Sequence, residues 1–123
     1  MNKARAATAV AATTAAMALA LTGTAQAVQV GTGVSHGASR ASATLELNGA
    51  IFRVSDNYVD GYGARVYYSS SVRSGSCTNE QGGGTTVTCD LPIGGGVAIT
   101  WRLCIKDNET LLACTAYRTD RTT

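Results

Sequence analysis

The stretch VAITWRLCIK at residues 97–106 decides the fold of this chain. Apolar and polar side chains alternate along it. One set comprises Val97, Ile99, Trp101, Leu103 and Ile105, and the other comprises Ala98, Thr100, Arg102, Cys104 and Lys106. Successive side chains of an extended strand point to opposite faces of its sheet, so this period of two is typical of a strand with one buried face. The stretch predicts a long β-strand with the Trp101 face in a core.

Outward from this strand, shorter alternating runs recur at intervals of about 8–12 residues, as in an all-β sandwich or barrel. Residues 42–47 and 50–54 flank Asn48-Gly49, the strongest two-residue hairpin signal, because both residue types tolerate positive φ. That turn places Leu45 opposite Phe52. Further strands are expected at 64–68, 85–91 and 111–118. No apolar stripe of helical period follows residue 27, so we expect a small antiparallel β-sandwich, Ig-like or jelly-roll-like.

The core of this sandwich is expected to contain the inward-facing apolar residues of the strands. These are Leu45, Phe52, Val54, Val66, Val87, Leu91, Val97, Ile99, Trp101 and Leu103.

The cysteine spacing predicts two hairpin disulfides. The four cysteines are Cys77, Cys89, Cys104 and Cys114. A bridge between the first two is centred on the Gly-Gly-Gly turn at 82–84, and a bridge between the last two is centred on the polar run at 107–110. Opposed residues of paired strands come close enough for such bridges, and closing each short loop adds about 3 kcal/mol of stability. The second bridge is expected on the outer surface of its sheet. Zinc is disfavoured because no close Cys-x-x-Cys pair occurs, and no metal or cofactor is expected.

Residues 1–27 have the pattern of a cleavable signal peptide. Lys3 and Arg5 precede a run without charge from 6 to 21, and small residues at 25 and 27 provide a cleavage site. A membrane anchor is the alternative, but a span needs about 20 predominantly apolar residues, and this Ala/Thr-rich run is shorter. We expect a secreted, extracellular protein with a flexible lead-in at 28–42, containing at most a short edge strand at 28–30, and the sandwich at 43–123.

Removal of the signal changes the charge balance. The chain has ten Lys and Arg against eight Asp and Glu, and loss of Lys3 and Arg5 leaves eight of each sign. Nucleic-acid binding depends on a basic surface that displaces counterions. A neutral mature chain of 96 residues therefore argues against a nucleic-acid partner, and the export signal argues against a membrane location after cleavage.

Catalytic signals are weak, and no catalytic residue is predicted. His36, the only histidine, lies in the expected lead-in, where nothing would orient it for catalysis. The carboxylates lie mostly at expected turns rather than as a pair in a cleft, as a glycosidase needs. Residues 56–61 (DNYVDG) have part of a calcium-loop pattern, but tyrosines occupy its third and twelfth positions. A loose turn-type calcium site stays open beside the simpler reading of a tight turn.

The segment 56–63 is the candidate ligand-binding site. It combines Tyr58 and Tyr62 with Asp56 and Asp60. Tyrosine on a rigid turn can stack on sugars or anchor a protein partner, although tyrosine is also common on half-buried strands. We expect a monomeric, non-catalytic binding module for an extracellular protein or glycan. The alternative is a secreted hydrolase inhibitor or a small antimicrobial effector.

Two resemblances bear on this expectation. The Ala/Thr-rich signal, the segment VSDNYVDGYGARVYY at 54–68 and the WRLC strand with its partner cysteine resemble uncharacterised small secreted two-disulfide β proteins of actinobacteria such as Streptomyces. The resemblance implies source, export and fold, but no activity. The α-amylase inhibitors of Streptomyces, also two-disulfide β-sandwiches, bind through a Trp-Arg-Tyr turn. Here Trp101-Arg102-Leu103 lies in mid-strand and the cysteine spacing differs, so that match fails.

Overall fold

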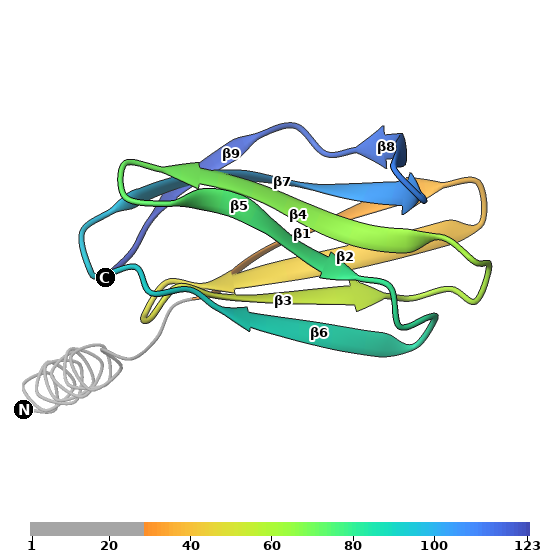
Figure 1. The fold of residues 1–123 in the computed structure, drawn as a ribbon, viewed down its shortest axis with the longest axis horizontal. Coiled ribbons are helices and arrows are strands. Elements are labelled where there is room, and N and C mark those ends of the chain that lie inside the picture. Colours follow the sequence, from red (N-terminus) through yellow and green to blue (C-terminus); the bar gives the residue numbers. More distant parts are fainter. Residues whose placement is uncertain (1–28) are drawn as a thin grey trace, which may run out of the picture.

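The computed structural model describes residues 29–123, which form nine β-strands and no helix (Figure 1). The strands are β1 (Gln29–His36), β2 (Ser39–Glu46), β3 (Ile51–Asp56), β4 (Gly63–Ser70), β5 (Ser74–Asn79), β6 (Thr85–Asp90), β7 (Ala98–Asp107), β8 (Thr110–Cys114) and β9 (Arg118–Arg121). The expected all-β class is confirmed. Within this part of the chain, no helix has the length and apolar character that crossing a membrane would require.

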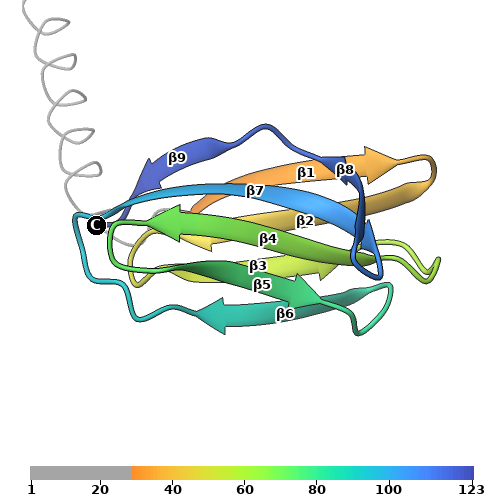
Figure 2. The ribbon, with the colours of Figure 1, turned by 45° about the horizontal axis from the view of Figure 1, so that its top comes forward.

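The strands form two antiparallel sheets that face each other as the layers of a sandwich (Figures 1 and 2). Sheet A has the order β1-β2-β3-β6. Sheet B has the order β5-β4-β7-β8, with β9 also paired to β7. The stretch that predicted the fold is β7, the longest strand, which pairs with β4 along eight registered positions from Gly63↔Lys106 to Ser70↔Ile99. It therefore forms the centre of sheet B.

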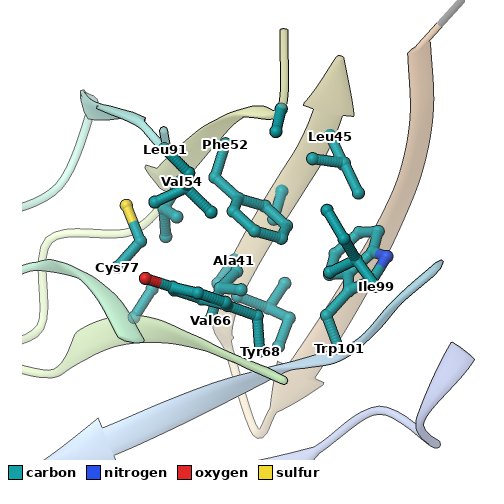
Figure 3. Packing of buried hydrophobic residues seen from close by; sticks show 14 of the residues in the cluster. Ala41, Leu45, Phe52, Val54, Val66, Tyr68, Cys77, Leu91, Ile99 and Trp101 are labelled. Atoms are coloured by element: carbon teal, nitrogen blue, oxygen red, sulfur yellow. The ribbon is translucent and has the colours of Figure 1, made fainter. Parts of the chain in front are cut away.

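The core lies between the two sheets (Figure 3). The Phe52 ring of sheet A contacts two aromatic rings of sheet B, with centroid distances of 5.6 Å to Tyr68 and 5.2 Å to Trp101. The alternation correctly predicted the buried side chains: of the ten expected core residues, only Val87 and Val97 are partly rather than fully buried. Burial of large apolar side chains contributes about 1.5–3 kcal/mol each, so this cluster dominates the stability of the fold.

Both disulfides form with the predicted pairing, Cys77–Cys89 and Cys104–Cys114, and no cysteine is free. The location of the first was predicted wrongly. Cys77 lies on β5 of sheet B and Cys89 on β6 of sheet A, so the bridge joins the two sheets instead of clamping a hairpin. The reason is that the connection after β5 crosses to the opposite layer. Such cross-links are typical of an oxidising, non-cytoplasmic compartment.

The second disulfide joins directly opposed residues of the β7–β8 hairpin, as expected. Cys104 occupies the outward-facing set of β7, yet it is fully buried rather than exposed on the surface. Its disulfide partner Cys114 lies directly opposite on β8 and is half-buried. The position of Cys104 in the outward-facing set of its strand thus did not mean exposure to solvent.

The expected flexible lead-in at 28–42 was wrong for the described residues 29–42, which form β1 and the first part of β2. The two strands pair over eight positions from Gln29↔Glu46 to His36↔Ser39, so the sandwich includes this segment. The alternation is weak in the sequence because the outward-facing Gly31 and Gly33 have no polar side chain and Thr32 lies between the inward-facing Val30 and Val34. Val28 and the predicted signal at 1–27 lie outside the described residues.

The hairpin between β2 and β3 has the predicted register, with Leu45 opposite Phe52. Its turn differs in conformation, because positive φ occurs at Gly49 and Ala50 and not at Asn48. The pairing pattern thus predicted the register, whereas the turn type depended on packing around Ala50, which is fully buried.

Because neighbouring strands run antiparallel, the connections gather at two ends of the sandwich. The end on the right in Figure 1 contains the connections at 37–38, 57–62, 80–84 and 108–109, and we call it the Tyr58 end. The opposite end contains the connections at 47–50, 71–73 and 91–97, and we call it the Val72 end.

Candidate functional site

The candidate loop at 57–62 connects β3 to β4 and so crosses from sheet A to sheet B at the Tyr58 end. Two aspartates turn its backbone. Asp56 Oδ1 accepts a hydrogen bond of 3.2 Å from the Tyr58 N–H, and Asp60 Oδ1 accepts one of 3.0 Å from the Tyr62 N–H. These are Asx turns, in which a short side chain bonds the backbone two residues later. Both predicted aspartates therefore shape the loop from within.

Neighbouring segments hold this loop in place. The Asn57 N–H donates to the Arg40 carbonyl at 2.9 Å, and the Gly84 N–H donates to the Asp56 carbonyl at 2.7 Å. The turn at 80–84 also touches the loop directly: a Cβ added to Gly83 would lie 2.6 Å from the backbone of Tyr58. The loop is thus braced from both sides by sheet A and by the 80–84 turn.

The tip of the loop is apolar and exposed. Tyr58 has 45% of its surface exposed, and Val59 has 82% exposed, the largest value among the large hydrophobic residues of the described chain. Sequence reasoning found Tyr58 but missed Val59, because a valine in a turn-rich segment gives no signal of its own. An exposed aromatic beside an exposed aliphatic residue, on a braced loop, is a surface that can anchor a partner.

The four predicted site residues do not converge on one ligand position. Tyr62 is half-buried against the core, with its ring 6.4 Å from the His36 ring, and the Asp56 carboxylate is buried. The four tyrosines between 58 and 68 are also dispersed: Tyr67 lies on the outer face of sheet B, and Tyr68 is in the core. Only Tyr58 presents its ring at the tip of the loop.

Burial raises the pKa of the Asp56 carboxyl above its ordinary value; the hydrogen bond from the Tyr58 N–H opposes this, and the nearby charge of Asp60 adds to it. The second carboxyl oxygen, Oδ2, is buried without a hydrogen-bond partner among the described residues. A buried carboxylate with one unpartnered oxygen is costly, because the charged form loses its hydration. Asp56 is therefore a structural residue of the loop.

A shallow hollow of about 270 Å³ lies beside the loop. Its lining residues are Gly61, Tyr62, Gly63, Glu80, Gly82, Lys106 and Asn108. The Lys106 side chain is only 2% exposed and donates a hydrogen bond from its Nζ to Glu80, which is 61% exposed. This bond and the positive charge lower the pKa of Glu80. The ion pair closes one wall of the hollow, and sequence analysis did not single out either residue.

His36 and the side chains of metal-ligating type are the remaining candidates for reactive chemistry in the described residues. Among residues 29–123, no group of three or more His, Cys, Asp or Glu side chains is placed to hold a metal ion. His36 ends β1 rather than lying in an unstructured segment. It is exposed, and its ring lies edge-on to the Tyr62 ring. Within residues 29–123 the His36 ring has no hydrogen bond to a serine, threonine or cysteine side chain, as a histidine that activates a nucleophile would have.

Comparison with known proteins adds no assignment: no protein-family model, curated protein or solved structure matches the chain.

Proposed function

We propose that the mature protein is a secreted, non-catalytic binding module that docks on a partner protein through the Tyr58 end. The observation that carries the proposal is the braced tip of the 57–62 loop, where Tyr58 and Val59 are exposed side by side. Tyrosine is among the residues that contribute most at protein interfaces. A loop already held in one conformation loses little entropy on binding.

The two disulfides support an extracellular place for this module, because they persist in oxidising compartments. Export is tested by the intact mass of protein recovered from the culture medium. The expected species begins at Val28 and has all four thiols oxidised. Retention of residues 1–27 in a cell-associated protein would contradict secretion.

The docking surface is tested with a paired set of variants. In the double variant Tyr58→Ala/Val59→Ser the apolar tip is lost. In the control Val72→Ser an aliphatic residue that is 63% exposed is removed at the opposite end. Immobilised wild-type protein and the Val72 variant are expected to retain the same extracellular protein, identified by mass spectrometry, and the double variant is expected to lose it. Equal retention by all three proteins would reject the Tyr58 end.

A hydrolase inhibitor is the second candidate, and the shape of the loop favours it. The 57–62 loop projects from its end of the sandwich (Figure 2), and a convex, braced loop can enter the cleft of an enzyme. The test is a panel of secreted hydrolases. Stoichiometric inhibition of one enzyme would support an inhibitor role if the Val72→Ser variant keeps the inhibition and the double variant loses it. Absence of inhibition across the panel at micromolar protein would reject it.

A further inference from the structure

The outer face of sheet B presents guanidinium groups and tyrosine rings in alternation. The guanidinium carbon lies 5.7 Å from the Tyr67 centroid for Arg65 and 5.8 Å for Arg102, and Arg102 also lies 4.7 Å from the centroid of Tyr117. We call these four residues the Arg–Tyr row. Tyr67 of β4 stands opposite Arg102 of β7, and Tyr117 belongs to the β8–β9 link. Sequence reasoning missed the row because β4, β7 and the β8–β9 link come together only in the folded sheet.

The two arginines of the row differ in how their charges are balanced. Arg65 donates to Thr78 Oγ1 at 2.7 Å and to the Tyr67 hydroxyl at 3.3 Å, and it lies 3.4 Å from Glu109 Oε2. The Arg102 side chain has no hydrogen bond or ion pair within residues 29–123, and its Nε is buried without a partner. The centre of the row is therefore an uncompensated positive charge, held in place between two aromatic rings.

Such a guanidinium is preorganised for a carboxylate. Its planar group matches the two oxygens of a carboxylate through parallel hydrogen bonds. Because Nε is covered, the two terminal nitrogens are the donors that remain for a ligand. The flanking rings fix the orientation of the group in advance, so little side-chain entropy is lost when an anion binds.

The surroundings favour a sugar over a peptide. The strands β4 and β7 are interior strands that are paired on both sides. They therefore have no unpaired backbone N–H and C=O groups to which an extended peptide could add as a further strand. Instead the face has small hydroxyl residues beside the row: Ser76 opposite Tyr67, and Thr100 and Thr119, whose Oγ1 atoms are 2.9 Å apart. Tyr117, 57% exposed, adds a flat ring with an apolar body.

We infer that the Arg–Tyr row is a second binding site, for an extended glycan that carries uronic-acid carboxylates. A carboxylate of the glycan pairs with Arg102. The apolar face of a sugar ring stacks on Tyr117, and ring hydroxyls bond the neighbouring serine and threonine side chains. This site is on the face of sheet B and does not depend on a partner at the Tyr58 end.

The test is calorimetric titration of the mature protein with three probes of similar length: hexagalacturonate, neutral cellohexaose and hexaglutamate. Hexagalacturonate is expected to bind, and the other two are expected not to bind at the same concentration. Absence of hexagalacturonate binding at millimolar concentration would overturn the site. Equal binding of hexaglutamate would overturn the glycan assignment, because any acidic chain would then suffice.

Four variants locate the binding. Arg102→Gln is expected to weaken hexagalacturonate binding at least about tenfold, because loss of even one of the two charged hydrogen bonds has an effect of that size. Arg102→Lys should lose most of the same affinity, because an ammonium lacks the planar pair of donors. Tyr117→Phe keeps the ring and is expected to retain binding. Arg40→Gln removes an equal charge from an exposed position on sheet A and is the matched control. Equal losses of affinity for Arg40→Gln and Arg102→Gln would show that binding depends only on net charge, and would overturn the proposal.

Discussion

The two long sides of the sandwich are closed by different chemistry. On one side, β5 and β6 are joined covalently by Cys77–Cys89, with Cα atoms 6.1 Å apart. On the other side, β9 of sheet B contacts β1 of sheet A through Arg118, which donates to the Gly31 carbonyl at 2.9 Å. We call the first the disulfide side and the second the polar side.

The polar side is anchored in the core by Trp101. Its indole N–H donates to Asp120 Oδ2 at 2.9 Å, and Arg118 donates to the same carboxylate from Nε at 2.8 Å and from Nη2 at 3.1 Å. The Arg118 guanidinium also lies over the Trp101 ring at 5.4 Å. A single carboxylate thus links a buried indole to the arginine that reaches the opposite sheet.

The comparison shows two ways to hold two sheets together in a small domain. A disulfide stabilises mainly by restricting the unfolded chain, so its contribution does not depend on the ionisation of neighbouring groups. The polar side depends on the charge of Asp120. Burial alone would raise the pKa of this carboxyl, but the hydrogen bonds from Arg118 and Trp101 and the charge of Arg118 outweigh burial, so the pKa is lowered.

The largest effect on stability is expected from removing the disulfide that joins the two sheets. The double variant Cys77→Ser/Cys89→Ser should lose about 3 kcal/mol of unfolding free energy, because a link across 12 residues of sequence no longer restricts the unfolded chain. Urea unfolding of the secreted protein measures this loss. The double variant Cys104→Ser/Cys114→Ser is the control for a link of similar span within one sheet. A loss below about 1 kcal/mol at the first link would contradict its assigned role.

The polar side is broken most directly by Asp120→Ala. The buried Trp101 N–H and the Arg118 guanidinium then lose their shared acceptor, at an expected cost of about 2 kcal/mol, since an unsatisfied buried donor carries its full desolvation penalty. Thermal unfolding at neutral pH measures the change. Asp90→Ala, at an exposed position of β6, is the control and should change stability by less than about 0.5 kcal/mol. Equal effects of the two substitutions would show that the polar side contributes nothing specific.

Arg118→Gln tests the contact between β9 and β1 on the polar side. It removes the donor to Gly31 and weakens the contact between β9 and β1, so we expect a loss of about 1 kcal/mol. Backbone amides of β1 should exchange with deuterium faster, while those of β5 and β6 stay protected by the covalent link. Uniform acceleration on both sides would mean that the variant destabilises the whole domain instead.

The smallest effect is a pH dependence confined to the polar side. Because the pKa of Asp120 is lowered on folding, the unfolded chain takes up its proton first as the pH falls. The contribution of Asp120 is therefore fully present above its ordinary pKa of 3.8 and is lost as the pH falls through the lowered folded value. The stability difference between wild type and Asp120→Ala should stay constant from pH 7 to near the ordinary pKa of 3.8 and shrink as the pH falls further. A difference that stays constant below that pH as well would contradict the ionised role of Asp120.

Local pattern predicted the parts of this fold that depend on one or two strands. The alternation around Trp101 placed that residue in the core, and the Leu45–Phe52 pair followed from the turn between them. The candidate loop was found only in part. Tyr58 is exposed as a binding residue would be, but burial of Asp56 depends on which segments pack over it, and no local pattern reports that.

The amino-acid sequence by itself determined the strand class, the inward face of the central strand and the Cys104–Cys114 link across a hairpin, because each depends on alternation or spacing along the chain. Only the tertiary structure decided which strands share a sheet. That choice placed Cys77 and Cys89 in opposite layers and brought Tyr67 beside Arg102. Contacts between residues distant in sequence depend on how whole faces pack, so the surfaces that could bind a partner became visible only in the folded chain.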